Sequence, residues 1–194
     1  MTPTAGLVLA GGLSRRMPGA SKLARPWADG TVLGAVVRTA RDAGLAPIVV
    51  VGRADEPLPP GSDAADLRLR VAPGGGRADS LALGLAELAP GPVVVLLGDE
   101  PGLRSDVVTA LVERCRAEAA DAGRVAYTDR PGHPVWLGRR ARAVAADLTG
   151  EAAVWEHVAR PPLNAVLLEV DEPAPIDVDT PGALERARRR RETR

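Results

Sequence analysis

The chain has 194 residues, of which 45% are hydrophobic and 26% are charged, as in an ordinary globular domain with an apolar core. Its 25 basic and 25 acidic residues cancel, so the overall charge favours neither nucleic acid nor an anionic membrane as a partner. We expect one domain over residues 1–194. No apolar run is long enough to span a membrane and no secretory signal is evident, so we expect a cytoplasmic protein. The single cysteine, Cys115, excludes an internal disulfide and suits a small core residue.

Short apolar runs typical of buried strands alternate with segments whose apolar residues recur at helical spacing. In chain order, the sequence predicts a strand at 5–10, a helix at 31–43, strands at 47–52 and 67–72, a helix at 77–88, a strand at 92–97 and a helix at 105–120. It then predicts strands at 125–128 and 134–137 around a turn at 130–132, helices at 139–148 and 152–158, a strand at 165–170 and a helix at 180–190.

This alternation predicts an α/β protein with a three-layer, Rossmann-like fold, whose mostly parallel central sheet carries helices on both faces. The run 92–97 is the most hydrophobic strand and is expected near the middle of the sheet. Ser105 and Thr180 are the predicted N-caps of their helices. Ligands of such sheets bind beyond the carboxyl ends of the strands, so motifs that follow strands carry the functional interpretation.

The first predicted strand leads into a segment rich in glycine and positive charge. Its notable residues are Leu9, Ala10, Gly11, Gly12, Ser14, Arg15, Arg16 and Lys22. Glycines let backbone amides approach phosphate oxygens closely, and the cations offset the charge of a triphosphate. Lys22 is the only lysine among 25 basic residues, which suggests a task that a guanidinium does not perform. The alternative is a plain strand-to-helix turn with surface arginines. The Walker A and dinucleotide patterns are both absent.

A carboxylate follows the predicted central strand. Asp99 lies two residues before Pro101, and a carboxylate at a strand end facing a triphosphate is a natural Mg²⁺ ligand. Alternatively, Asp99 only closes a turn. Near the end of the chain, Asp177 and Asp179 fall on one side of an extended segment, so that either of them could complete the metal site.

Two further segments are weaker candidates. Gly75 lies in a glycine run that could approach a nucleotide base, and Ser80 could donate a hydrogen bond to that base. The alternative is a strand-to-helix connection capped by Asp79 or Ser80. His133 and Pro134 lie at a predicted turn and are candidate contacts for an acceptor substrate, although a lone histidine in a turn is more often structural.

In this order, the segments resemble the MobA-like NTP transferases, especially the molybdenum cofactor cytidylyl- and guanylyltransferases. The family signature L-A-[AG]-G-x-S-x-R-M-G-x-x-K is similar to residues 9–22, with Pro18 lengthening the spacing by one. The family's metal-binding Asp before x-Pro matches Asp99, and its Ser-Leu-x-x-Gly matches residues 80–84. Residues 132–135 and 177–181 look like the cytidylyltransferase branch, and residues 10–12 like the guanylyltransferase branch. Residues 148–153 lack the charged pattern usual in the acceptor half of cytidylyltransferases.

The resemblance implies a nucleotide-diphospho-sugar transferase-like fold and Mg²⁺-dependent transfer of NMP from CTP or GTP to the phosphate of a molybdopterin-type precursor, with release of pyrophosphate. Residues 1–105 would mainly bind NTP and metal, and residues 106–194 the acceptor. Lys22, Arg16 and Asp99 would be catalytic, and Asp99 and Asp179 would hold Mg²⁺. Alternatives are a nucleotidyltransferase for a sugar phosphate or another phosphorylated cofactor precursor, or a non-catalytic NTP-binding protein that assists a molybdoenzyme maturation partner.

Overall fold

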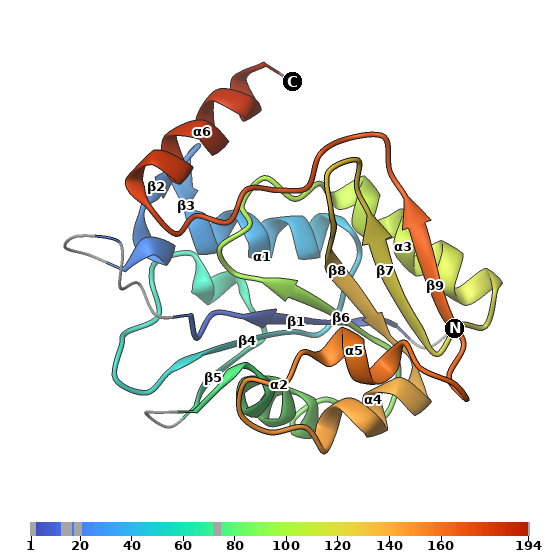
Figure 1. The fold of residues 1–194 in the computed structure, drawn as a ribbon. Coiled ribbons are helices and arrows are strands. Elements are labelled where there is room, and N and C mark those ends of the chain that lie inside the picture. Colours follow the sequence, from blue (N-terminus) through green and yellow to red (C-terminus); the bar gives the residue numbers. More distant parts are fainter. Residues whose placement is uncertain (1–2, 13–16, 18–20, 72–74, 194) are drawn as a thin grey trace.

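The computed structural model describes residues 3–12, 17, 21–71 and 75–193. Its centre is a seven-stranded sheet in the order β5-β4-β1-β6-β8-β7-β9 (Figure 1). The strands are β1 (Ala5–Leu9), β4 (Ile48–Arg53), β5 (Leu67–Val71), β6 (Val93–Leu97), β7 (Ala122–Ala126), β8 (Pro131–Leu137) and β9 (Ala165–Glu169). Within this sheet β8 alone runs antiparallel to its neighbours, β6 and β7. The expected mostly parallel sheet is therefore confirmed, with β6 as its central strand.

Helices cover both faces of the sheet, as predicted (Figure 1). One hydrophobic cluster joins the sheet to α1 (Val32–Asp42), α3 (Ser105–Ala117) and α6 (Pro181–Glu192). A second cluster, on the other face, joins it to α2 (Arg77–Ala86), α4 (Arg139–Ala146) and α5 (Val154–Val158). Among the residues described, no helix is both long and apolar enough to cross a membrane.

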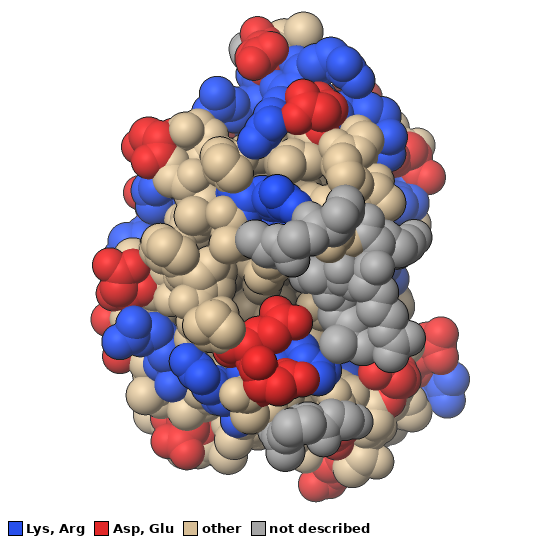
Figure 2. All heavy atoms as spheres, turned by 90° about the vertical axis from the view of Figure 1, so that its left-hand side faces the viewer, with Lys and Arg blue, Asp and Glu red and all other residues tan. Residues whose placement is uncertain are grey.

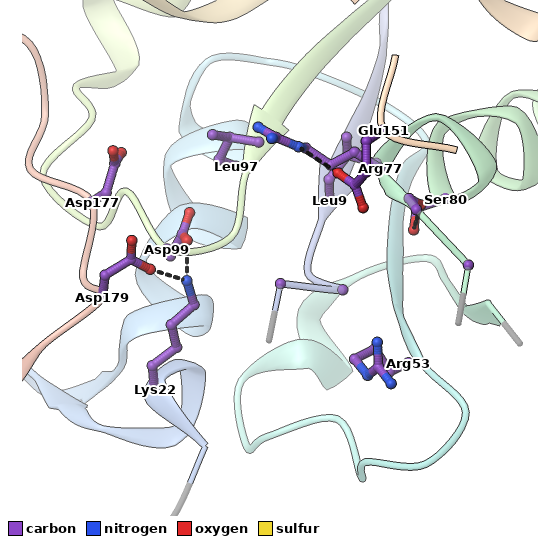
Figure 3. A pocket seen from close by; sticks show the side chains of 14 residues that line it. Leu9, Lys22, Arg53, Arg77, Ser80, Leu97, Asp99, Glu151, Asp177 and Asp179 are labelled. Atoms are coloured by element: carbon purple, nitrogen blue, oxygen red, sulfur yellow. Dashed lines mark hydrogen bonds and ion pairs between the residues drawn. The ribbon is translucent and has the colours of Figure 1, made fainter. Parts of the chain in front are cut away.

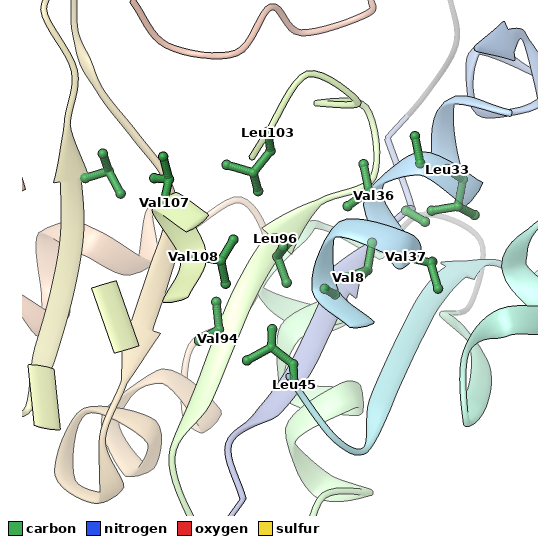
Figure 4. Packing of buried hydrophobic residues seen from close by; sticks show 14 of the residues in the cluster. Val8, Leu33, Val36, Val37, Leu45, Val94, Leu96, Leu103, Val107 and Val108 are labelled. Carbon is green, nitrogen blue, oxygen red and sulfur yellow. The ribbon is translucent and has the colours of Figure 1, made fainter. Parts of the chain in front are cut away.

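The two cores follow from the period-two alternation of strand side chains. In β1, Val8 packs into the first cluster and Leu7 into the second, and both are fully buried. Figure 4 shows Val8 and Leu96 of the sheet beneath α1. Each such aliphatic side chain contributes about 1.5–3 kcal/mol when removed from water. Cys115 is a buried core residue on α3, as expected, and burial raises the pKa of its thiol to about 12.

The predicted helix caps and the predicted hairpin turn agree only in part with the structure. Thr180 caps α6 as predicted, and its hydroxyl accepts a hydrogen bond from Ala183 N at 3.1 Å. Ser105, in contrast, is the first residue of α3 and not its cap, because the helix begins one residue earlier than expected and Arg104 takes the N-cap position. The hairpin turn closes earlier than residues 130–132, since Tyr127 N donates to Arg130 O and β8 already begins at Pro131.

Two small features between β1 and α1 were not predicted. A short 3-10 helix, η1 (Lys22–Ala24), is followed by a two-stranded hairpin of β2 (Pro26–Trp27) and β3 (Gly30–Thr31). Another 3-10 helix, η2 (Ser62–Ala64), lies in the connection from β4 to β5. Runs of two or three residues have no detectable periodicity, so pattern reasoning cannot find them. η1 matters for the site because it carries Lys22.

A close approach of α2 to β1 gives the first prediction. A Cβ added at Gly84 would overlap with the side chain of Leu7 in the buried second cluster. Gly84→Ala is therefore expected to lower the free energy of unfolding by about 1–3 kcal/mol, because a packed core accommodates an extra methyl group poorly. Urea denaturation measures the change. Gly102→Ala is the matched control, since a Cβ there meets nothing within 4 Å. Equal stabilities of the two variants would contradict the packing described.

Candidate active site

A cavity of 350 Å³ opens at the carboxyl ends of β1, β4 and β6 (Figure 3). Its lining residues are Leu9, Gly11, Gly12, Lys22, Arg53, Gly75, Gly76, Arg77, Ser80, Leu97, Asp99, Glu151, Asp177 and Asp179. Figure 2 shows this end of the molecule, where acidic side chains gather beside a central hollow and basic side chains gather at the top, over α6. The position agrees with the general rule that ligands of parallel sheets bind beyond the strands' carboxyl ends.

The glycine turn after β1 is fixed by backbone hydrogen bonds to both neighbouring strands. Ala10 N donates to Val51 O at 2.8 Å, and Gly98 N donates to Leu9 O at 2.9 Å. Ala10 itself is buried in the core and does not line the cavity. Gly11 and Gly12 do line it, and a Cβ at Gly11 would lie 3.2 Å from Ser80 Oγ. A Cβ at position 11 would therefore be in tight contact with Ser80.

Lys22 is the centre of the polar side of the cavity. Its ammonium group donates to Asp99 Oδ2 and to Asp179 Oδ1, the latter at 2.6 Å (Figure 3). The lysine residue is only 3% exposed. Three segments distant in sequence, η1, the loop after β6 and the segment before α6, thus meet at one nitrogen atom. The structure brings together the predicted residues Lys22, Asp99 and Asp179.

The charge state of Lys22 follows from two opposing effects. Burial lowers the pKa of its ammonium group, whereas the charges and hydrogen bonds of Asp99 and Asp179 raise it, and the net effect is a raised pKa. The amine is therefore held as a cation at physiological pH. Such a group can neutralise anionic charge but cannot serve as a general base.

The segment before α6 is attached to the loop after β6 by its backbone. Val178 N donates to Asp99 O at 2.9 Å, which turns Asp179 toward Lys22. Asp177 also lines the cavity but lies near Arg130, with 3.7 Å between Asp177 Oδ1 and the guanidinium. Of the two carboxylates that the sequence left as alternatives, Asp179 is the one in contact with Lys22.

Glu100 was not anticipated by sequence reasoning, although it follows Asp99 directly. Its side chain is fully buried, at 1% exposure, and Oε2 has no hydrogen-bond partner among the described residues. Burial raises the pKa of Glu100 well above its ordinary value, and a hydrogen bond to Asp177 and the charges of Asp177 and Asp99 raise it further. The raised pKa favours the protonated form of this carboxyl group, which shares a hydrogen bond with Asp177 of the segment before α6. The sequence did not indicate this burial, because Glu100 is a charged residue and precedes Pro101 in a loop.

The remaining predicted nucleotide contacts have mixed outcomes. Gly75 and Ser80 line the cavity. The hydroxyl of Ser80, however, donates to Gly76 O at 3.2 Å, four residues back in the same helix turn. Neither Asp79 nor Ser80 is the N-cap of α2, because Gly76 takes that position and Asp79 accepts from Gly76 N at 2.6 Å. Ser14, Arg15 and Arg16 lie outside the described residues.

The predicted acceptor contacts do not line this cavity. His133 lines a second, adjoining cavity of 290 Å³, and Pro134 is buried next to it without lining either cavity. The proposed acceptor contact of His133 would thus lie in the second cavity. Pro134 is a buried residue and lines neither cavity. The peptide bond between the two residues is cis.

Sequence reasoning missed Arg53, Arg77 and Glu151, which also line the first cavity. Arg53 ends β4 next to β1, and its guanidinium donates to both oxygens of Asp55 at 2.9 and 2.7 Å. Its place at the carboxyl end of a buried strand was a usable signal. Arg77 Nε lies 3.7 Å from Glu151 Oε2, a contact between distant segments that no local pattern reveals.

The acidic side chains of the cavity offer oxygen ligands to a metal ion. No group of three or more His, Cys, Asp and Glu side chains within the described ranges is arranged to hold one. Mg²⁺ needs only one or two carboxylates when phosphate oxygens and water complete its octahedron. Asp99 and Asp179 approach one point, the position of Lys22 Nζ, from two sides. This donor set of oxygens alone fits a hard divalent cation that arrives with a triphosphate.

Comparison with known proteins agrees with the geometry. Residues 6–165 match the MobA-like NTP transferase domain, and the chain belongs to this nucleotidyltransferase family. Comparison with curated proteins finds no match. The crystal structure of Rv0371c from Mycobacterium tuberculosis H37Rv is similar, with 30% identity and a TM-score of 0.83 over 97% of this chain and 99% of that chain.

Two further structures place the fold. A manganese complex of Rv0371C from Mycobacterium tuberculosis H37Rv has 28% identity and a TM-score of 0.79, over 97% of this chain and 99% of that one. A CMP:2-keto-3-deoxy-manno-octonic acid synthetase complexed with CTP has 17% identity and a TM-score of 0.76, over 99% of each chain. The latter likeness concerns the fold alone. The expected nucleotidyltransferase-type fold is confirmed.

The buried acid gives a prediction about pH. Because the pKa of Glu100 in the fold lies above its unfolded value of about 4.3, its contribution to stability is complete below that pH and is lost as pH rises through the folded pKa. A glutamine side chain has nearly the same shape as a glutamate side chain and cannot ionise. The free energy of unfolding of Glu100→Gln relative to wild type should therefore rise with pH, by at most about 1.4 kcal/mol per unit.

Urea denaturation at several values between pH 5 and pH 8 measures this difference. Glu113→Gln, an exposed site on α3, is the matched control for removal of one acidic side chain. A stability difference between Glu100→Gln and wild type that stays constant over the range would mean that Glu100 is not held protonated.

Proposed function

We propose that the chain is a Mg²⁺-dependent nucleotidyltransferase that transfers NMP from CTP or GTP to the phosphate of a molybdopterin-type cofactor precursor. The observation that carries the proposal is the buried Lys22 ammonium bound by Asp99 and Asp179, at the edge of a cavity entered by the Gly11-Gly12 turn. Membership of the MobA-like family supports the reaction type. The manganese complex of the related Rv0371C protein supports a divalent metal.

In the proposed reaction, an oxygen of the acceptor phosphate attacks the α-phosphorus of the NTP. The bond from the α-phosphorus to the bridging oxygen breaks, and pyrophosphate leaves with the electron pair. The nucleophile is already ionised, so no general base is required, which agrees with the protonated state of Lys22. Catalysis would rest on alignment and on neutralising phosphate charge.

Asp99 and Asp179 would hold Mg²⁺, and the ion, when bound, supplies positive charge to the triphosphate. The same two carboxylates bind Lys22, so its ammonium group must leave them to admit a cation. The released ammonium is then available to phosphate oxygens. The amides of Gly11 and Gly12 and the guanidinium of Arg53 would bind phosphate at the opposite wall.

We propose that residues 1–105 mainly bind the NTP and the metal and that residues 106–194 mainly bind the acceptor. Most residues that line the first cavity lie in the first of these segments, whereas Asp179, a proposed metal ligand, lies in the second. Two alternatives remain distinct in experiment: transfer to a sugar phosphate or another phosphorylated precursor, and NTP binding without turnover in the assembly of a molybdoenzyme.

Lys22→Met tests the central contact. Removal of the ammonium group frees Asp99 and Asp179, so the variant should bind Mn²⁺ more tightly than wild type in the absence of nucleotide, as titrated by electron paramagnetic resonance. The same variant should release pyrophosphate about 10²-fold more slowly or worse, because a donor to the transition state is lost. Asp99→Asn should lose metal binding and turnover together. Wild-type turnover in Lys22→Met would exclude the role given to this lysine.

Nucleotide choice and activity are tested with the wild-type protein. Thermal unfolding is followed with Mg²⁺ and each of the four NTPs, and CTP or GTP is expected to raise the midpoint most, because a ligand that binds only the folded state stabilises it. Pyrophosphate release is then assayed with molybdopterin-type acceptors and with sugar phosphates. Nucleotide binding without pyrophosphate release from any acceptor would favour the non-catalytic alternative.

A further inference from the structure

The loop between α4 and α5, residues 147–153, folds back onto the start of α2 at the wall of the first cavity. Gly75, Gly76 and Arg77 line the cavity where α2 begins, and Glu151 lines it from the loop. Arg77 Nε lies 3.7 Å from Glu151 Oε2 at this wall (Figure 3). Two segments far apart in the sequence thus form one side of the proposed nucleotide site.

The carboxylate of Asp79 joins these two segments. Its Oδ2 accepts a hydrogen bond from Gly76 N at 2.6 Å, and its Oδ1 accepts one from Gly150 N at 3.1 Å. Gly150 O in turn accepts from Ala78 N at 2.9 Å. The two hydrogen bonds from backbone amides lower the pKa of Asp79, so its carboxylate is ionised at physiological pH. We call these three hydrogen bonds the Asp79 clip.

The clip brings two stretches of backbone into direct contact. A Cβ added at Gly76 would lie only 2.1 Å from Gly150 O. Gly150 has a φ of +65°, in the left-handed region that glycine adopts most easily. A side chain at position 76 would therefore push the loop away from α2, and the clip depends on glycine at this position.

The clip is separate from the contacts that hold α4 on α2. At the other end of α2, the guanidinium of Arg142 on α4 donates to Leu85 O and to Ala89 O, both at 2.6 Å. These bonds anchor α4 independently of Asp79. Loss of the clip is thus expected to release the loop after α4 and to leave the packing of the two helices in place.

The clip also uses the first amides of α2 inside the protein. Free amides at a helix N-terminus often bind phosphate. In α2, however, Gly76 N donates to Asp79 and Ala78 N donates to Gly150 O. A triphosphate in the first cavity would therefore depend on the glycine turn after β1 and on nearby cations. The start of α2 contributes the shape of the cavity wall.

Resting on the proposed function, we propose that Asp79 is a positioning residue of the nucleotide site. Asp79 does not itself belong to the cavity lining described above, and it acts through Gly76, Arg77 and Glu151, which do. The clip holds residues 148–151 and the start of α2 in the arrangement that binds NTP. A wall that is ordered before binding spares the ligand the entropic cost of ordering it, so the clip raises the affinity for NTP.

Isothermal titration calorimetry with Mg²⁺ and CTP or GTP tests this role. Asp79→Ala should weaken NTP binding about tenfold, because the wall must then be ordered at the expense of binding. Asp79→Asn keeps one oxygen acceptor of the two and should be intermediate. Gly76→Ala breaks the same contact from the other side and should also weaken binding. The double variant Asp79→Ala/Gly76→Ala should bind no more weakly than the weaker single variant, since both changes remove one shared contact.

Two control variants separate positioning from loss of stability and from charge. Asp106→Ala is the matched control, because the Asp106 carboxylate also accepts a backbone amide, Val107 N at 2.9 Å, in the first turn of a helix and does not line the first cavity. It should bind NTP like wild type. Glu151→Gln removes a negative charge from the wall and should bind NTP at least as tightly as wild type.

The outcomes distinguish the positioning role from the proposed function. Unchanged or tighter NTP binding by Asp79→Ala would overturn the positioning role, as would an equal loss of binding in Asp106→Ala. Thermal unfolding of each variant without nucleotide shows whether it is folded, and Asp79→Asn keeps the test available if Asp79→Ala is not. Absence of NTP binding in wild type refutes the proposed function, whereas NTP binding that wild type and Asp79→Ala share refutes the role of Asp79 alone.

Discussion

The contact of one buried ammonium group with two carboxylates organises this molecule. Lys22, Asp99 and Asp179 come from η1, from the loop after β6 and from the segment before α6. Each carboxylate would be costly to bring near the other without a cation between them, and the lysine would be costly to bury without them. The three groups therefore stabilise one another. Lys22, from the first part of the sequence, and Asp179, from the last, thus meet Asp99 after the central strand β6, where we propose that the chemistry takes place.

The topology of the sheet determines where the contact between Lys22, Asp99 and Asp179 lies. Parallel strands place the carboxyl ends of β4, β1 and β6 along one edge, and the glycine turn leaves β1 between the other two strands. The antiparallel strand β8 reverses the direction beside β6, so His133 reaches the same edge from the opposite end of its strand. One sheet edge thus carries two adjoining cavities, a polar one over β1 and β4 and a mainly apolar one toward β8.

Much of the fold was predictable because buried parallel strands and amphipathic helices leave periodic patterns. Lys22 and Asp99 were found because each follows a strand end and each is unusual in type or context. Glu100 was missed because its raised pKa comes from burial and from Asp177, far away in the sequence, whereas Arg53 was missed although it ends a buried strand. Ser105 and Asp79 show a related limit: the residue that satisfies a helix amide was predicted by type, but its exact position depends on where the turn begins. Asp177 and Asp179 were equivalent by alternation and became distinct only through the hydrogen bond from Val178 to Asp99.

The buried carboxyl group of Glu100 lies within electrostatic reach of both cavities, because Asp177 and Asp99 raise its pKa and its own charge acts on Arg124, which lines the second cavity. Lys22, Asp99 and Asp179 together carry one formal negative charge, which the proposed divalent cation would convert to a net positive charge facing the proposed triphosphate. An ionised Glu100 would add a negative charge directly beside Asp99 and oppose the approach of phosphate. It would also act on Arg124, whose charge Glu100 favours when ionised. The raised pKa that burial gives to this one carboxyl group thus favours the proposed binding of a metal-bound triphosphate in the first cavity.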